Sequence, residues 1–307
     1  MTTPVSISGS WVAIPTPMHE DGSINYDEFR RLVDFQAANG SSAVLICGSA
    51  GEVSMLDPEE RREVIRRTAA YADGKIHAFY GTTCATTAAT VDLTRFAEDH
   101  GAAGVVLTVP AYSLPPQTAI FDFLVTVAAA TELAVAVYNN PMRVHRNIEP
   151  ETIAAFHREA SNFVADKEAV ADASQISRVI ELTGGELSVL ACDNPGYGLL
   201  PTAVALADGM ANITGNLHPR ELAYLSDTAN VTGDLAHWRQ RQIAMLPLMR
   251  ACYGMPNPVA VKAGLELLGF AVGGPRLPLQ RLHGGLLDEL KQLVTDYRLG
   301  ETYDRRP

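Results

Sequence analysis

The sequence lacks the features that mark several large classes of protein. Its four cysteines are far apart and never form a CxxC pair, and its eight histidines form neither an HxH nor an HxxxH pair. This spacing argues against a disulfide framework and against a local zinc site. No apolar run reaches the roughly 18 residues that a transmembrane helix needs. The N-terminal segment MTTPVSISGS lacks the basic start and apolar run of a signal peptide.

Basic residues are also scarce. The 307 residues include 24 basic and 35 acidic ones, which gives a net charge of −11. A chain this acidic, with no basic run, is a poor ligand for nucleic acid or for an anionic membrane. Neither GxGxxG nor GxxxxGKS/T is present, so the common phosphate-binding loops are missing. We expect a cytoplasmic globular protein with no nucleic-acid or membrane partner.

What the sequence does contain is a repeating unit of a short apolar run, a polar turn and an amphipathic stretch. The apolar runs are too short for helices and mostly continuous, which is typical of parallel strands covered on both faces. Eight such runs occur, at residues 11–16, 42–47, 76–81, 103–109, 133–139, 162–168, 187–193 and 209–214. The stretches between them have helical period, and one of them begins with Asp57 as a predicted N-cap and Pro58 in the first turn.

The alternation of strands and helices predicts the α/β class with a parallel sheet. Eight units of about 25–30 residues favour a closed (β/α)8 TIM barrel over an open sheet. Three further helical stretches follow the eighth barrel helix, at 235–252, 257–270 and 278–297. We therefore predict a catalytic barrel over residues 1–230 and a three-helix C-terminal extension over residues 231–307.

In such a barrel the active site lies where the strands end. Lys167 stands out there, because the chain has only four lysines against twenty arginines. Side chains alternate along a strand, so Lys167 and Asp166 lie on opposite faces. Burial would lower the pKa of the ammonium group and supply the neutral amine that attacks a carbonyl to form a Schiff base. The alternative is a structural ion pair with Asp166, Glu168 or Asp193.

Three further features stand at predicted strand ends. Tyr138 closes an apolar run, where a phenol either serves as a general acid or base or packs as a core aromatic. Residues 48–51 form a turn of small residues whose backbone N–H groups can hold a carboxylate or a phosphate. Arg143 follows in a loop, where a guanidinium either clamps a carboxylate or is simply solvated.

Two other types of enzyme have weaker support. The segment CGSAG is similar to a nucleophile elbow, which would make Ser49, Asp193 and His218 a triad, but Cys47 replaces the first glycine of the elbow. The count of eight strands also argues against that hydrolase fold. A metal-dependent aldolase has little support from the scattered histidines.

Taken in order, these pieces resemble the pyruvate-dependent class I lyase family that includes 4-hydroxy-tetrahydrodipicolinate synthase and N-acetylneuraminate lyase. The family's GTTGE motif is similar to residues 48–52, and its YNxPxR motif is similar to residues 138–143. Its Schiff-base motif, Lys-Glu/Asp-Ala, matches residues 167–169, and its PNPxxxK segment matches residues 256–262. The resemblance covers nearly the whole chain, and the synthase is the nearest branch.

The resemblance implies a role for each matching residue. Lys167 forms a Schiff base with pyruvate, and Tyr138 shuttles protons during the reaction. Ser49 links Tyr138 to Tyr112, which in relatives crosses from a neighbouring subunit. The resemblance therefore implies a homo-oligomer, expected to be a dimer of dimers. No metal and no organic cofactor is needed, because the lysine supplies the electron sink.

The resemblance also implies how the substrates are held. The backbone amides of Ser49 and Ala50 hold the pyruvate carboxylate, and the backbone carbonyl of Ala211 is a further contact. Arg143 occupies the place where the synthase binds the carboxylate of aspartate semialdehyde. Ala50 replaces a threonine of the synthases, which keeps a 2-keto-3-deoxy sugar-acid aldolase, or a related 2-keto acid lyase or dehydratase, as the alternative. A non-catalytic keto-acid-binding protein is the alternative of another class, and the retained lysine, tyrosine and serine argue against it.

Two departures from the family pattern carry expectations of their own. Small residues stand where bacterial synthases have polar, acidic or aromatic contacts to the effector lysine, so we expect no inhibition by lysine. These residues are Thr83, Ala85, Ala89 and Ala111. Asp166 replaces an aliphatic residue, and we expect it to face the helix layer and to have a buried partner such as an arginine.

Overall fold

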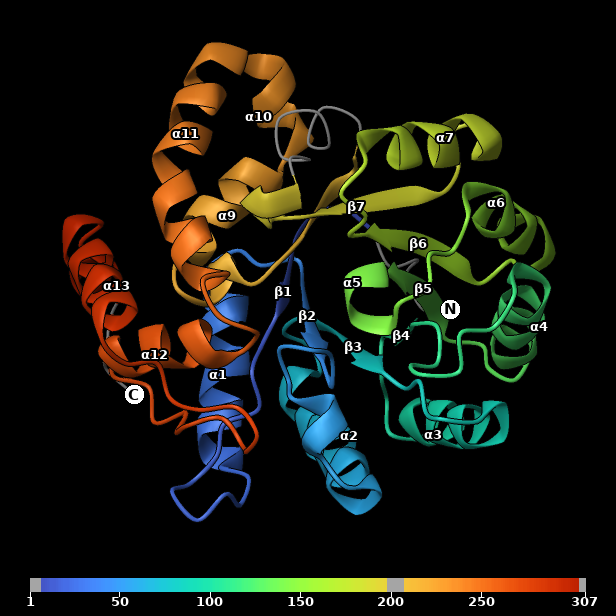
Figure 1. Ribbon diagram of the computed structural model, residues 1–307, viewed down its shortest axis with the longest axis horizontal. Coiled ribbons are helices and arrows are strands. Elements are labelled where there is room, and N and C mark those ends of the chain that lie inside the picture. Colours follow the sequence, from blue (N-terminus) through green and yellow to red (C-terminus); the bar gives the residue numbers. More distant parts are fainter. Residues whose placement is uncertain (1–6, 198–206, 304–307) are drawn as a thin grey trace.

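The computed structural model describes residues 7–197 and 207–303. Eight parallel strands among these residues close into a barrel, with the last strand hydrogen-bonded to the first (Figure 1). The strands are β1 (Gly9–Ala13), β2 (Ala43–Ile46), β3 (His77–Gly81), β4 (Gly104–Leu107), β5 (Ala134–Asn139), β6 (Phe163–Glu168), β7 (Ser188–Cys192) and β8 (Gly209–Asn212). The predicted α/β class, the eight strands and the TIM barrel are confirmed.

Helices between the strands form the outer layer of the barrel (Figure 1). They are α1 (Tyr26–Ala38), α2 (Pro58–Ala72), α3 (Thr87–Asp99), α4 (Gln117–Ala128), α6 (Pro150–Glu159), α7 (Ala173–Thr183) and α9 (Pro219–Ser226). Helix α2 begins as predicted, because the side chain of Asp57 accepts a hydrogen bond from the backbone N–H of Glu60 at 2.7 Å. The Glu60 carboxylate returns a bond to the Asp57 N–H, which completes a capping box.

The pleat turns alternate side chains of each strand into the barrel interior. There the rings of Trp11 and Phe79 pack with their centroids 4.4 Å apart, and both side chains are fully buried. Small residues such as Ala165 fill the remaining interior positions. Strand register places Tyr138 of β5 beside Lys167 of β6. Apolar side chains therefore fill the interior, and Tyr138 and Lys167 form a polar pair at the carboxyl ends of two neighbouring strands.

The chain continues past the barrel into helices that pack on its side (Figure 1). They are α10 (Thr228–Gly233), α11 (Leu235–Cys252), α12 (Val259–Leu267), α13 (Gly285–Asp296) and α14 (Leu299–Thr302). The three predicted helical stretches are confirmed as α11, α12 and α13, and the predicted boundary between residues 230 and 231 lies within α10. None of the helices in the described ranges is long and apolar enough to cross a membrane.

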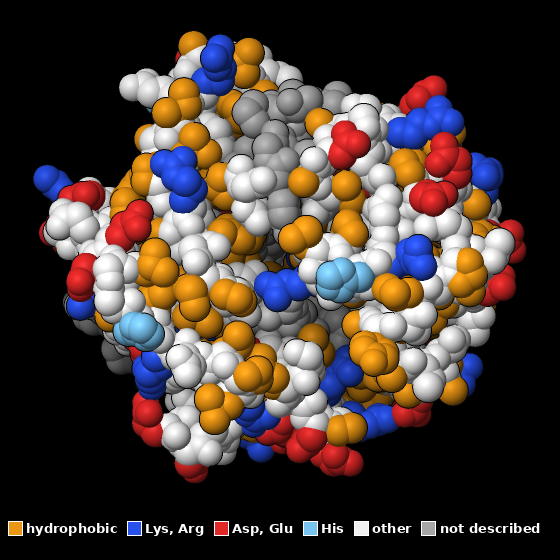
Figure 2. All heavy atoms as spheres, viewed as in Figure 1, with side chains coloured by type: hydrophobic (Ala, Val, Ile, Leu, Met, Phe, Trp, Pro, Cys, Tyr) orange, Lys and Arg blue, Asp and Glu red, His pale blue; other side chains and the backbone are white. Residues whose placement is uncertain are grey.

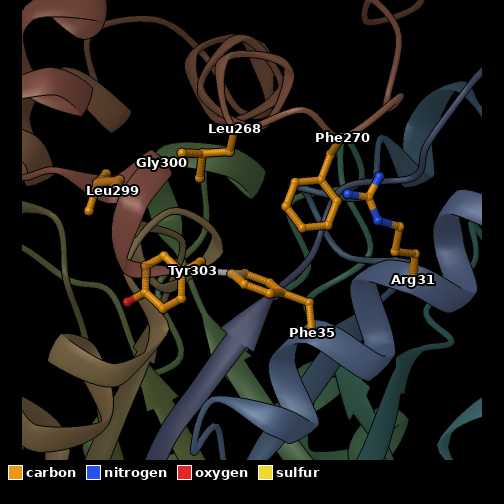
Figure 3. A pocket seen from close by; sticks show the side chains of 7 residues that line it. All are labelled: Arg31, Phe35, Leu268, Phe270, Leu299, Gly300 and Tyr303. Atoms are coloured by element: carbon orange, nitrogen blue, oxygen red, sulfur yellow. The ribbon is translucent and has the colours of Figure 1, made fainter. Parts of the chain in front are cut away.

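An aromatic cluster joins this extension to α1 (Figure 3). The ring centroid of Phe35 on α1 lies 5.1 Å from that of Phe270 and 5.3 Å from that of Tyr303. The guanidinium carbon of Arg31, one helical turn earlier, lies 4.4 Å from the Phe270 ring centroid, which is cation–π geometry. These contacts fix the extension against the barrel and so position the segment between α11 and α12, which reaches the mouth of the barrel.

Candidate active site

Two adjoining cavities, of about 380 and 860 Å³, open where the strands end. The residues common to both are Ala13, Ser49, Tyr138, Asn140, Arg143, Lys167, Pro256 and Asn257. The described lining includes the basic residues Arg61, Arg143 and Lys167, and no Asp or Glu. Figure 2 shows basic and hydrophobic side chains around the central hollow of this face, with acidic ones mostly toward the edge. The charges favour an anionic occupant.

Lys167 projects from β6 into both cavities and is only 8% exposed. Burial lowers the pKa of its ammonium group, and Cys192 and Asp193 partly oppose that shift. No carboxylate in the described part of the chain forms a salt bridge with Lys167. The structural ion pair considered as the alternative is therefore not formed among the described residues. The lowered pKa means that the neutral amine forms more readily than in an exposed lysine.

Tyr138 forms the wall beside this lysine. The nitrogen of Lys167 lies 4.0 Å from the centroid of the Tyr138 ring. The phenol oxygen accepts a hydrogen bond of 2.5 Å from Nδ2 of Asn140. Because the ring contacts both the lysine and this amide, its hydroxyl is held within the cavity close to the amine. These contacts place the phenol in the wall of the cavity that contains the amine, where it is a candidate for proton transfer.

The turn after β2 has an unusual backbone. Cys47 and Glu52, at its two ends, have positive φ angles of 54° and 58°, in the left-handed region that few residues other than glycine adopt. Gly81 on β3 approaches so closely that a side chain there would lie 2.2 Å from the Cys47 carbonyl oxygen. Within this turn Ser49 lines both cavities, whereas the methyl group of Ala50 is buried in the core. The proposed role of Ala50 thus depends on its backbone amide alone.

A buried ion pair anchors the same turn to the C-terminal extension. Oε1 of Glu52 lies 2.5 Å from Nζ of Lys262 on α12, and both side chains are at most 1% exposed. Oε2 of Glu52 accepts the backbone N–H of Arg276 at 2.7 Å, and Nζ of Lys262 donates to the carbonyl of Gly274 at 3.0 Å. Lys262, the lysine of the PNPxxxK segment, therefore holds the end of the turn at residues 48–52 in place.

Arg143 lies on the short helix α5 (Pro141–Val144), which directly follows β5. Its exposed side chain lines both cavities and forms no salt bridge within the described part of the chain. An arginine whose charge is not neutralised by the protein, at the edge of a site without carboxylates, is suited to bind a substrate carboxylate.

The other two predicted site residues lie in different surroundings. Ala211 of β8 lines the smaller cavity. Tyr112 does not line either cavity among the described residues, because its side chain points away from its own chain and is 99% exposed, with a φ of 75°. A link from Tyr138 through Ser49 to Tyr112 is therefore not made by one chain, and the prediction that a neighbouring subunit supplies this tyrosine remains untested.

Comparison with known proteins identifies the family. Residues 6–297 match the Dihydrodipicolinate synthetase family. The chain belongs to this family. It is 36% identical to 4-hydroxy-tetrahydrodipicolinate synthase of Trichlorobacter lovleyi over 95% of this chain and 99% of that protein. It resembles the crystal structures of the dihydrodipicolinate synthases from Aquifex aeolicus (TM-score 0.90, 32% identity, 96% and 99% of the chains covered) and Thermotoga maritima (TM-score 0.88, 31% identity, 95% and 99%).

For a member of this family, Asp166 has unexpected surroundings. It lies on the outer face of β6, as predicted, but its partner is not an arginine. Burial and the nearby carboxyl of Glu168 raise its pKa well above the ordinary value. Burial also raises the pKa of Glu168 to about 7, although that residue accepts hydrogen bonds from Asn139 and Val170. Two positions apart on one strand face, the carboxyls cannot both be charged without large cost, so the protonated, neutral form of Asp166 is favoured in place of the expected ion pair.

The serine-hydrolase alternative fails on geometry. His218 bonds through Nδ1 to the hydroxyl of Tyr303 at 2.5 Å, and burial lowers its pKa to about 4. Asp193 instead accepts hydrogen bonds from Thr214 and from the hydroxyl of Tyr253. No triad with Ser49 is assembled. The described residues also contain no group of three His, Cys, Asp or Glu side chains placed to hold a metal ion.

The sequence analysis missed several residues that line the site of this synthase-family chain. They are Asn140, Cys192, Asn194, Tyr253 and Asn257. The sequence could have indicated Asn140, because it directly follows Asn139 at the end of a predicted strand. Tyr253 and Asn257 come from the segment between α11 and α12, and only the fold of the extension brings them to the barrel mouth.

Proposed function

We propose that this protein condenses pyruvate with aspartate semialdehyde through a Schiff base on Lys167, as expected for a 4-hydroxy-tetrahydrodipicolinate synthase. The observation that carries the proposal is the placement of Lys167. It is a buried lysine with a lowered pKa, against the ring of Tyr138, in a cavity whose described lining has no carboxylate. A binding protein for a keto acid would need none of this chemistry.

The reaction begins at the amine. The neutral Nζ of Lys167 attacks the keto carbon of pyruvate, and the oxygen leaves as water after accepting protons. The hydroxyl of Tyr138, held beside the amine, passes these protons. Loss of a proton from the methyl carbon of the imine gives an enamine. That carbon then attacks the aldehyde carbon, and a proton returned through Tyr138 neutralises the new alkoxide.

The turn after β2 is proposed to hold the carboxylate of pyruvate. The backbone amides of Ser49 and Ala50 serve as the donors, and the strained ends of the turn fix them before the substrate arrives. The Ser49 hydroxyl is proposed to relay protons between Tyr138 and Tyr112 of a second copy. The carbonyl of Ala211 is proposed as a contact on the opposite side of the cavity.

The aldehyde is proposed to be acidic. Arg143 forms no salt bridge with a carboxylate among the described residues and lies at the edge of the cavity. It is therefore placed to bind the carboxylate of aspartate semialdehyde. A sugar-derived aldehyde carries several hydroxyl groups that need hydrogen-bond partners, and it has no carboxylate for Arg143 to bind. The choice of the synthase over a sugar-acid aldolase rests on this residue.

We also propose that the active form is a homo-oligomer, most simply a dimer of dimers. The support is Tyr112, which is 99% exposed on the loop after β4, a large aromatic side chain left without contacts by its own chain. In a dimer this ring would enter the partner's site. Sedimentation of the wild type would report the assembly, and the activity of Tyr112→Phe would report the role of the hydroxyl.

A comparison of aldehydes tests the proposed function. With pyruvate saturating, purified enzyme is assayed with aspartate semialdehyde and with glyceraldehyde, and the loss of pyruvate is followed in both. We expect kcat/KM to be at least about a hundredfold higher for aspartate semialdehyde. A preference for glyceraldehyde would favour the sugar-acid aldolase, and binding of pyruvate without turnover of either aldehyde would favour the binding protein.

A further inference from the structure

Asn140 differs from its neighbour in a way that the strand alone does not explain. Asn139, on the outer face of β5, has its amide fully engaged: Nδ2 donates to Asn147, Ile148 and Glu168, and Oδ1 accepts the backbone N–H of Ile148. Asn140 is only 4% exposed, and its Nδ2 donates to the hydroxyl of Tyr138 at 2.5 Å. Its Oδ1 is buried and has no hydrogen-bond partner among the described residues.

A buried acceptor without a partner is uncommon, because the lost hydrogen bonds to water are not replaced. The backbone explains why the side chain stays there. The carbonyl of Asn140 accepts the N–H groups of Arg143 and Val144 at 3.0 and 3.2 Å, and Pro141 follows directly. These constraints fix the residue at the start of α5, with its side chain in the wall of both cavities.

The surroundings of this oxygen define what it can bind. Arg143, three residues further on, lines the same cavities, and so does Lys167. Asn257, which also lines both cavities, presents a second buried amide oxygen without a partner. Neutral acceptors beside a cation, with no carboxylate in the described lining, suit an anionic substrate that also carries an N–H or O–H donor.

We infer that Asn140 is a specificity-determining residue: its Oδ1 accepts a hydrogen bond from an amino or hydroxyl group of the aldehyde substrate, while its Nδ2 positions Tyr138. The inference rests on the proposed Schiff-base reaction and extends it to the substrate class, an acidic aldehyde that also carries an N–H or O–H donor. Aspartate semialdehyde, with its carboxylate and amino group, belongs to that class. The oxygen of the amide thus acts on the aldehyde substrate and the nitrogen acts on Tyr138, and experiments can separate the two effects.

The test compares two aldehydes that differ only in the donor. Succinate semialdehyde has the carbon chain and carboxylate of aspartate semialdehyde and lacks its amino group. The measured quantity is the rate at which the condensed adduct forms on Lys167, after borohydride quenching and intact mass, because this step precedes any ring closure by the amino group. Asn140→Leu removes both halves of the amide, and Asn140→Asp keeps an acceptor oxygen while removing the N–H donor to Tyr138.

We expect Asn140→Leu to slow adduct formation with aspartate semialdehyde about tenfold more than with succinate semialdehyde. Asn140→Asp should slow adduct formation with both aldehydes, because it removes the N–H donor to Tyr138 and adds a charge that repels the carboxylate of each. Equal losses on both aldehydes in Asn140→Leu would overturn the specificity role and leave Asn140 as a positioning residue for Tyr138. If the leucine variant is not folded, Asn140→Ala gives the same comparison.

Failure of the proposed aldehyde is distinguishable from failure of this inference. If the wild type forms a pyruvate adduct but does not react with aspartate semialdehyde, the substrate proposal is wrong. Glyceraldehyde and propionaldehyde then form the comparison, because they have the same carbon chain with and without hydroxyl donors. A selective loss on glyceraldehyde in Asn140→Leu would support the inference, and equal losses on both would overturn it.

Discussion

The ammonium nitrogen of Lys167 lies over the face of the Tyr138 ring, 4.0 Å from its centroid. The negative face of the ring favours the charged lysine, while burial favours the neutral amine, and burial is the larger influence on its pKa. The same ring is held at its hydroxyl by Asn140. One aromatic side chain thus touches the proposed nucleophile and carries the proposed proton-transfer group, which ties the position of one to that of the other.

Arg143 is expected to determine how tightly the acidic aldehyde binds. Arg143→Ala should lower kcat/KM for aspartate semialdehyde by about 10- to 100-fold, since a hydrogen-bonded charged contact contributes about 1.5–3 kcal/mol. The rate of pyruvate adduct formation on Lys167 should change little, because the arginine acts on the second substrate. Steady-state kinetics with both aldehydes checks this, and small, equal losses on aspartate semialdehyde and glyceraldehyde would rule out the assigned role.

The fold was predictable because its signals are local and repeated. Each apolar run marks one parallel strand, and the strand ends differ by only a few residues from those predicted, as at β2 (Ala43–Ile46 against 42–47). The alternation of side chains predicted that Lys167 and Asp166 lie on opposite faces of their strand. Such inferences need only the chain's own periodicity.

What the sequence did not predict depends on contacts between distant segments. Tyr253 reaches Asp193 only because α11 packs back on the barrel. The expected cationic partner of Asp166 was wrong, because burial and a second carboxyl on the same strand face raise the pKa of Asp166 and favour its neutral form. The role of Asn140 depends on the separate surroundings of its two amide atoms, which its position in the sequence does not indicate.

The ion pair of Glu52 and Lys262 is expected to stabilise the fold and the anion-binding turn together. Lys262→Met leaves the Glu52 carboxylate buried without its cation, which should lower the free energy of unfolding by about 3–5 kcal/mol. The double variant Glu52→Gln with Lys262→Met should recover much of that stability, because no charge is then buried. Urea unfolding of the three proteins measures this, and a loss below about 1 kcal/mol in Lys262→Met would contradict the buried pair.

Asp166 and Glu168 predict an unusual dependence of stability on pH. Both pKa values are raised in the folded protein above their ordinary values of 3.8 and 4.5, that of Glu168 to about 7. The folded state therefore binds more protons than the unfolded state between about pH 4 and 7, and the contribution of the pair to the free energy of unfolding falls as pH rises through this window. Each proton contributes a slope of up to about 1.4 kcal/mol per pH unit.

The variant Asp166→Val isolates this effect. It removes one carboxyl of the pair and leaves an apolar side chain that fits the helix-facing surface of β6. Relative to the wild type, the variant should become steadily more stable as the pH is raised from 4 to 7, as measured by urea unfolding at several pH values. A stability difference between variant and wild type that is constant across this range would show that the pKa values of the two carboxyls are not raised in the folded protein.

Lysine is not expected to inhibit the enzyme. Thr83, Ala85 and Ala111 line the larger cavity together with Arg61, and its described lining has no carboxylate for the side-chain ammonium of lysine. Ala89 is an exposed residue of α3 outside that lining. Initial rates with and without lysine check this. Inhibition at low-millimolar lysine would show that a pocket for it exists despite these small residues.

The central claim, that Lys167 forms a Schiff base with pyruvate, is tested most directly by borohydride trapping. The wild type and Lys167→Arg are each incubated with pyruvate and reduced, and the adduct is read by intact mass and peptide mapping. We predict one pyruvyl adduct per chain, on Lys167, and none in the variant. A folded wild type with no adduct, or with the adduct on another lysine, would contradict the account.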